Sequence, residues 1–183
     1  MKLTFITGNA DKAKQIQEFL NIEIDHQKVD LDEIQSLDLQ EIVEHKVRQA
    51  YEKLKKPVLV EDVSLVFNAL GKLPGPLIKW FLQSIGNDGM CKLLDGYEDR
   101  SATAKVLFGY FNGTNLEFFD AEVAGSITDL PRGGDGFGFD YIFVPDGQEK
   151  TWAEINVLQH PEFSMRIPAL RKLEKYLATN GKS

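Results

Sequence analysis

A short apolar segment that ends in two carboxylates places the strongest constraint on how this chain folds. Residues 58–60, Val-Leu-Val, suit a buried β-strand, and Glu61 and Asp62 follow at once. In open α/β sheets, ligands bind beyond the carboxyl ends of the strands. An acidic pair there can bind a hard cation such as Mg²⁺ or act as a base. Because buried carboxylates need a cation nearby, we expect a metal or a lysine beside them, the alternative being an ordinary turn.

The segments before this strand alternate between strand and helix patterns. Residues 3–6 predict a first strand, residues 10–20 a helix, and residues 21–31 an extended segment. Asp38, with Glu41 three residues later, predicts the start of an amphipathic helix that ends near Lys55. A β-α-β-α-β order indicates a mixed or parallel sheet.

The remaining segments extend this sheet. The pattern predicts helical stretches over 76–94, strands at 102–111 and 116–127 joined by a turn, a glycine-rich loop at 132–139, a strand at 141–144 and a helix at 164–178. We expect an α/β fold with a long twisted mixed sheet, flanking helices, and two lobes that enclose a central substrate cleft. Without a linker-like stretch, residues 1–183 predict one domain.

Composition limits the compartment and the partners. A net charge of −7 argues against a nucleic acid polymer, although lysines and a metal could still bind a small polyanion. A single cysteine, Cys91, excludes an internal disulfide and fits a reducing compartment. No apolar run approaches the ~20 residues of a membrane span. We expect a cytoplasmic enzyme that binds no membrane.

Lysines near two helix starts suggest a site for phosphate. Thr7, Gly8 and Asn9 follow the first strand, where glycine admits a ligand and free amides favour an anion. Lys12 could add positive charge there, and Lys79 lies in the first turn of a predicted helix, where a bound phosphate would offset the unfavourable dipole. The alternative is a helix cap and solvated lysines.

Lys46 projects toward the apolar face of its predicted helix. At about 100° per residue it lies between the directions of Leu39 and Ile42. A lysine on an inward face either extends to solvent or meets an anion.

The segment from Gly136 to Asp140 combines glycines with Phe137 and Phe139. It lacks the phosphate-loop pattern and precedes a strand. Two phenylalanines between glycines could stack a base, at about 1–3 kcal/mol per base, or pack into the core. Neither the histidines nor Cys91 show zinc-type spacing or a nucleophilic triad.

Together these motifs resemble the inosine triphosphate pyrophosphatase family over nearly the whole chain. The resemblance rests on TGNADK at 7–12, VEDVSL at 60–65, LPGPLIKWF at 73–81 and GFGFDYIF at 136–143. It implies Mg²⁺-dependent hydrolysis of deaminated purine nucleoside triphosphates (ITP, dITP and XTP) to a monophosphate and pyrophosphate, by a homodimer. Such an enzyme removes these nucleotides from the pool.

The resemblance also implies roles for matching residues. Asp62 would be catalytic and bind the metal with Glu33 and Glu61, and Lys12 and Lys79 would assist catalysis. The implied substrate-binding residues are Thr7, Gly8, Asn9, Lys12, Lys46, Lys79, Phe137, Gly138, Phe139, Asp140, His160, Ser164, Met165 and Arg166.

The chain departs from the family pattern where the base would be recognised. Ser164-Met165-Arg166 replaces the usual Ser-His-Arg, and His160 stands where a lysine-asparagine pair is expected. Phe139 replaces the usual tryptophan or tyrosine before Asp140. Two alternatives therefore stay open: a pyrophosphatase with altered or relaxed base specificity, and a nucleotide-binding protein without catalysis. Retention of Glu33, Asp62 and the lysines argues against the latter.

Overall fold

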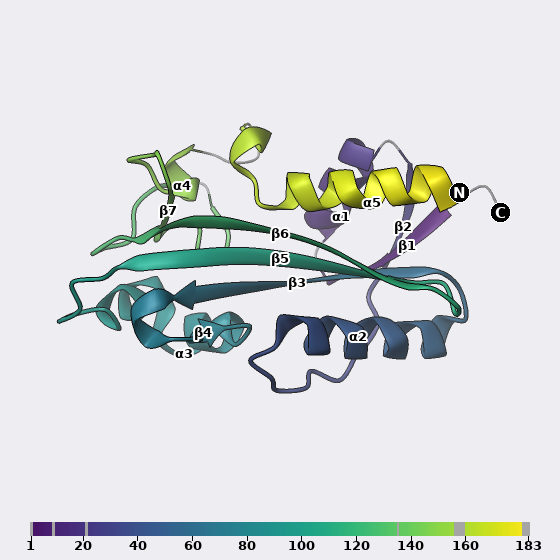
Figure 1. The fold of residues 1–183 in the computed structure, drawn as a ribbon, viewed down its shortest axis with the longest axis horizontal. Coiled ribbons are helices and arrows are strands. Elements are labelled where there is room, and N and C mark those ends of the chain that lie inside the picture. The colour runs from purple at the N-terminus through teal and green to yellow at the C-terminus, as the bar shows by residue number, and fades with distance from the viewer. Residues whose placement is uncertain (1, 9, 21, 135, 156–159, 181–183) are drawn as a thin grey trace. The chain divides into compact units, whose positions relative to one another are not determined.

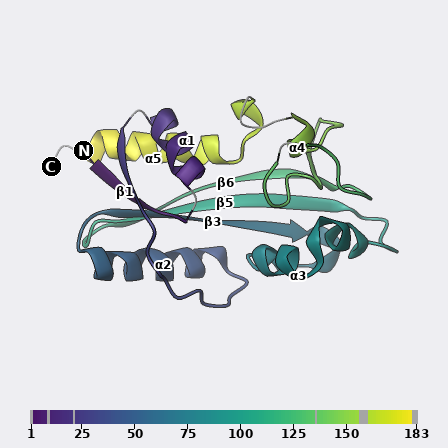
Figure 2. The same ribbon diagram turned by 180° about the vertical axis from the view of Figure 1, so that it is seen from behind.

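The computed structural model describes residues 2–8, 10–20, 22–134, 136–155 and 160–180. Their helices and strands are drawn in Figures 1 and 2. In chain order they are β1 (Lys2–Ile6), α1 (Ala10–Leu20), β2 (Glu23–Gln27), α2 (Leu39–Leu54), β3 (Val58–Phe67), a 3-10 turn (Asn68–Leu70), β4 (Pro74–Gly75), α3 (Ile78–Lys92), β5 (Ser101–Phe111), β6 (Leu116–Ile127), β7 (Phe143–Pro145), α4 (Trp152–Ile155), a second 3-10 turn (Pro161–Phe163) and α5 (Arg166–Asn180).

The strands form one mixed sheet, which confirms the predicted α/β fold class. Its strand order is β2-β1-β3-β5-β6-β7, and β4 pairs with β3 off this path. β1 is parallel to both β2 and β3, whereas β4 is antiparallel to β3 and β7 is antiparallel to β6. The parallel part therefore lies at the N-terminal end of the chain, as the β-α-β-α-β pattern predicts.

The expectation that the central strand ends at Glu61 is wrong. β3 continues without interruption to Phe67, so both carboxylates lie inside the strand. Its parallel ladder with β1 does end there, because Ile6 opposite Val60 is the last pair. The second half of β3 instead pairs with β4, through Leu65 and Val66.

The chain divides into two compact units whose boundaries cross three strands. Unit 1 contains Met1–Asp62, Val106–Ala121 and Pro168–Ser183, and unit 2 contains Val63–Lys105 and Glu122–Ile167. β3, β5 and β6 each contribute residues to both units. We describe each unit by itself.

Unit 1 places helices on both faces of its strands. Figures 1 and 2 both show α2 on one face and α1 and α5 on the other. Asp38 caps α2 by accepting hydrogen bonds from the backbone N–H groups of Gln40 and Glu41, which confirms the predicted helix start. The inward face of α2, with Val43 and Val47, packs in a buried cluster that also contains Ile6, Val58, Val60 and Leu107.

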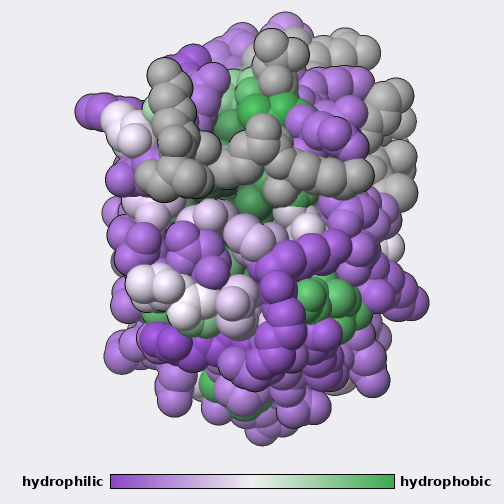
Figure 3. Space-filling view, turned by 90° about the vertical axis from the view of Figure 1, so that its right-hand side faces the viewer, coloured by the Kyte–Doolittle hydropathy of each residue, from purple (hydrophilic) through white to green (hydrophobic). Residues whose placement is uncertain are grey.

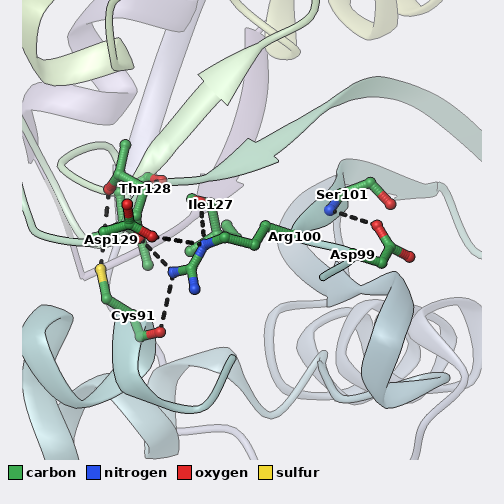
Figure 4. Close-up of polar contacts among 8 residues, drawn as sticks. Cys91, Asp99, Arg100, Ser101, Ile127, Thr128 and Asp129 are labelled. Atoms are coloured by element: carbon green, nitrogen blue, oxygen red, sulfur yellow. Dashed lines mark hydrogen bonds and ion pairs between the residues drawn. The ribbon is translucent and has the colours of Figure 1, made fainter. Parts of the chain in front are cut away.

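Unit 2 contains a buried cysteine beside an arginine that binds backbone carbonyls (Figure 4). Arg100 donates to the carbonyl oxygens of Ile127 at 2.9 Å, Thr128 at 2.7 Å and Cys91 at 3.1 Å. These bonds satisfy carbonyl groups that would otherwise be costly to bury. Cys91 is fully buried, and this burial raises the pKa of its thiol.

Three other segments differ from their predictions. Only Glu23–Gln27 of the extended stretch forms a strand, and residues 28–36 have no regular secondary structure. α3 begins at Ile78 rather than at Pro76, and it is broken at Gly86, whose φ of 64° is unusual for residues with a side chain. The last strand is Phe143–Pro145 rather than 141–144.

The surface drawn in Figure 3 is mainly hydrophilic, with apolar side chains in small separate patches. Within the described residues, no helix is both long enough and apolar enough to cross a membrane.

Candidate functional site

The β1–α1 junction and the carboxylates of β3 lie at the same edge of the parallel sheet in unit 1. Ile6 and Val60 are opposite each other in register, so Thr7 and Glu61 each follow the last shared pair. The backbone of Thr7 is held by β2, because its N–H donates to the Gln27 carbonyl at 3.1 Å and its own carbonyl lies 2.7 Å from His26 Nε2. Gly8 is exposed, and a Cβ built there would meet nothing within 4 Å.

Lys46 meets two carboxylates that come from distant segments. Its Nζ lies 2.7 Å from Asp62 Oδ2 and 3.8 Å from Glu33 Oε1. The exposed fractions of the three side chains are 16%, 23% and 40%, in the order Lys46, Asp62, Glu33, so solvent screens the pairs only partly. Of the two outcomes left open for an inward lysine, the structure has the second, an anion partner.

This cluster has donors that suit a divalent cation. Asp62 and Glu33 already face one positive centre, the Lys46 ammonium, and carboxylate oxygens are the ligands that Mg²⁺ prefers. Across the described part of the chain, no group of three or more His, Cys, Asp or Glu side chains could hold a metal ion. Two carboxylates alone would leave most coordination positions of a hard cation to other ligands, such as water.

Glu61 points away from this cluster. Adjacent residues of a strand face opposite sides of the sheet, and both Glu61 and Asp62 lie within β3. Because Asp62 faces Lys46, Glu61 faces the other side. Its role as a metal ligand stays a prediction.

The side chains of the predicted phosphate segment are only partly described. Asn9 lies outside the described residues, and so does the side chain of Lys12, although its backbone belongs to the first turns of α1. Lys79, in unit 2, is exposed in the first turn of α3, with its ammonium 5.2 Å from the centre of the Trp80 ring. Contact of these residues with phosphate stays a prediction.

In unit 2, the two phenylalanines of the glycine-rich loop have opposite environments. Phe137 is 70% exposed, whereas Phe139 is 5% exposed and its ring centre lies 6.0 Å from that of Trp152. The core-packing alternative raised by the sequence therefore holds for Phe139, whereas stacking of a base on Phe137 stays a prediction. Phe137 has the exposed face that stacking needs, and Phe139 packs in the core.

Hydrogen bonds to the backbone hold this loop in place. Asp140 Oδ2 accepts the Phe137 N–H at 2.9 Å, Asn87 Nδ2 donates to the Gly138 carbonyl at 3.0 Å, and Tyr141 Oη donates to the Gly136 carbonyl at 2.9 Å. Burial raises the pKa of the Asp140 carboxyl, and the Phe137 hydrogen bond and the charge of Arg166 oppose that shift. Asn87 carries no motif, so the sequence did not indicate it.

The residues before α5 divide into buried and exposed members. Ser164 Oγ accepts the backbone N–H of Arg166 at 3.2 Å, which is a helix-capping contact. Met165 is 4% exposed. His160 is exposed, with its Nδ1 3.4 Å from Glu162 Oε1. Buried Met165 therefore contributes apolar packing where the family pattern has a polar ring.

Comparison with known proteins gives consistent matches over nearly the full length. The sequence profile of the Ham1 family matches residues 3–176. An inosine triphosphate pyrophosphatase of Pyricularia oryzae is 46% identical over 180 residues, covering 96% of this chain and 93% of the relative. An inosine triphosphate pyrophosphatase 2 of Trypanosoma cruzi is 41% identical, covering 96% and 91%. A solved HAM1 protein from Coxiella burnetii has the same fold, with a TM-score of 0.87 at 23% identity over 98% and 99% of the two chains.

Proposed function

This chain belongs to the Ham1 family, and we propose that it hydrolyses deaminated purine nucleoside triphosphates to a nucleoside monophosphate and pyrophosphate. The substrates are ITP, dITP and XTP, and the reaction removes them from the nucleotide pool. The Asp62–Lys46–Glu33 cluster carries this proposal, because it combines a carboxylate for water with a cation for phosphate.

The residues of the cluster divide the chemistry between them. Asp62 orients a water molecule and accepts its proton, which is general-base catalysis. Lys46 stabilises the negative charge that develops on the phosphate oxygens, and its contact with Asp62 keeps both groups in place. Mg²⁺, when bound by Asp62 and Glu33, would neutralise the phosphates and polarise the phosphorus. Phe137 stacks on the base through its exposed face.

Release of pyrophosphate tests the proposal. The purified chain is incubated with ITP, dITP, XTP, ATP and GTP, with Mg²⁺ or with EDTA, and pyrophosphate and orthophosphate are measured separately. We expect pyrophosphate, Mg²⁺ dependence, and a preference for the 6-oxo bases of ITP and XTP over the 6-amino base of ATP. Orthophosphate as the main product would refute cleavage between the α- and β-phosphates, and nucleotide binding without either product would indicate a binding protein.

Buried Met165 favours a second candidate, in which the same reaction has a relaxed base preference. A site that hydrogen-bonds its ligand rejects an analogue strongly, because polar groups are left unpaired. A thioether is only a weak acceptor and does not donate, so that penalty is smaller here. The ratio of kcat/KM for ITP to that for ATP separates the two candidates.

Location and assembly complete the proposal. We propose a cytoplasmic homodimer, in line with the expectations from Cys91 and from the family resemblance. Size-exclusion chromatography with light scattering measures the assembly directly.

A further inference from the structure

The segment that contains Glu33 has no backbone ladder to hold it. Residues 28–36 lie between β2 and α2 without regular secondary structure. Val29 and Leu31 pack against the buried cluster under α2, so the acidic residues that alternate with them, Asp30 and Asp32, are exposed. These apolar contacts anchor one side of the segment. Its acidic edge, formed by Asp30, Asp32 and Glu33, must be held by other groups.

One stripe of α2 binds that acidic edge. Lys46, Gln49 and Lys53, at positions i, i+3 and i+7, share a face of the helix. Lys53 Nζ donates to the Asp30 carbonyl, Gln49 contacts Asp32, and Lys46 faces Glu33 at 3.8 Å. The segment therefore runs along α2 in the direction opposite to the helix.

Gln49 contacts Asp32 through both ends of its amide. The Asp32 backbone N–H donates to Gln49 Oε1 at 2.7 Å, and Gln49 Nε2 donates to Asp32 Oδ2 at 2.5 Å. This reciprocal pair fixes both the backbone and the side chain of the residue directly before Glu33. Because glutamate is long and Glu33 is partly exposed, the position of its carboxylate depends on where its backbone is held.

We propose that Gln49 is a positioning residue, which holds the backbone at Asp32 and thereby places the Glu33 carboxylate beside Lys46 and Asp62. The inference rests on the proposed function in one respect, namely that Glu33 binds the metal of a metal–nucleotide complex. Residues that orient metal ligands change metal affinity or activity by about 10- to 100-fold when they are replaced.

A swap of the two partners tests the proposal. In Gln49→Glu, the new carboxylate can still accept the Asp32 backbone N–H, but it repels the Asp32 carboxylate instead of donating to it, so the side-chain half of the pair is lost. In the double variant Asp32→Asn with Gln49→Glu, the asparagine amide donates to the new carboxylate and the pair forms again with its polarity reversed. Gln49→Leu removes both hydrogen bonds without adding charge, and Arg48→Gln, which alters an exposed pair with Glu44, is the matched control on the same helix.

Two readouts are measured on the full chain. The first is calorimetric binding of Mn²⁺ in the presence of an inosine triphosphate analogue with a non-hydrolysable α–β bridge. The second is amide hydrogen exchange over residues 28–36. We expect Gln49→Glu and Gln49→Leu to weaken Mn²⁺ binding by about 10-fold and to speed exchange, the double variant to recover most of both losses, and Arg48→Gln to match the unchanged chain.

Other results overturn the proposal. Wild-type Mn²⁺ affinity in Gln49→Leu, or a double variant no better than Gln49→Glu, would show that Gln49 does not position Glu33. Failure of the unchanged chain to release pyrophosphate would instead refute the proposed function. The hydrogen-exchange comparison does not depend on turnover, so it would still decide whether Gln49 holds this segment.

Discussion

The charged cluster of unit 1 and the glycine-rich loop of unit 2 are held by different kinds of contact. In the cluster, side chains from three segments contact one another directly, and Lys46 is the centre. In the loop, side chains bind backbone groups, as Asp140 does at the Phe137 N–H and Asn87 at the Gly138 carbonyl. Mutations in the cluster therefore act mainly by removing charge. Mutations in the loop act mainly by removing contacts that hold the backbone.

The largest expected effect is on the chemistry of the cluster. Asp62→Asn keeps the size of the side chain and a hydrogen-bond acceptor for Lys46, but it removes the base. We expect turnover to fall by about 10²–10⁴-fold, with the thermal unfolding midpoint little changed. Steady-state pyrophosphate release and circular dichroism measure the two quantities. Near-normal turnover would remove Asp62 from its proposed role.

The two phenylalanines give the next contrast, because one ring is buried and the other exposed. Phe139→Ala removes a ring that packs against Trp152, so the free energy of unfolding should fall by about 3–5 kcal/mol. Phe137→Ala should leave stability within about 0.5 kcal/mol, since the ring is mostly exposed. It should instead weaken nucleotide binding by about 1–3 kcal/mol, the scale of one stacked base.

Urea unfolding and calorimetric titration with a non-hydrolysable nucleotide separate the two effects. If Phe137→Ala bound nucleotide as tightly as the unchanged chain, stacking on this ring would be refuted. Equal losses of stability in both variants would contradict the difference in burial.

A smaller effect is expected at Met165, whose buried side chain stands where the family pattern has a hydrogen-bonding ring. Met165→His restores a hydrogen-bonding ring, and we expect the preference for ITP over ATP to improve by about 1–2 kcal/mol, the scale of one hydrogen bond. Met165→Leu keeps the buried volume without any polar group, so it is the control and should leave the ratio unchanged. An unchanged ratio in Met165→His would refute the second candidate function.

Helix periodicity predicted the cluster better than strand pattern did. Counting 100° per residue placed Lys46 on the inward face of α2, and the structure pairs it with Asp62 and Glu33. The strand at Val58 was predicted too short, because two carboxylates after three apolar residues resemble a strand end. A carboxylate is tolerated at a half-buried position inside β3, because Lys46 from α2 pairs with Asp62 there.

Contacts between segments far apart in sequence could not be predicted in the same way. A period indicates which face a residue occupies but not its partner, so Gln49 and Asp32, 17 residues apart, showed no pattern. Asn87 and Gly138 are 51 residues apart, and neither belongs to a recognisable pair. Likewise, Phe137 and Phe139 looked equivalent in the motif, and only their burial distinguishes them.

The smallest expected effect is a pH dependence that belongs to the loop. Burial raises the pKa of Asp140 above its ordinary 3.8, so the folded chain holds this proton to higher pH than the unfolded chain does. The protonated carboxyl therefore favours the folded state at low pH, and that contribution is lost as pH rises through the folded pKa. Asp140→Asn does not titrate but can still accept the Phe137 N–H through its amide oxygen. We expect the unfolding free energy of the variant, relative to the unchanged chain, to increase as pH rises from below 3.8 toward neutral. Urea unfolding of both chains over a pH series measures this difference, and a difference that fell with rising pH would show that Arg166 and the hydrogen bond outweigh burial.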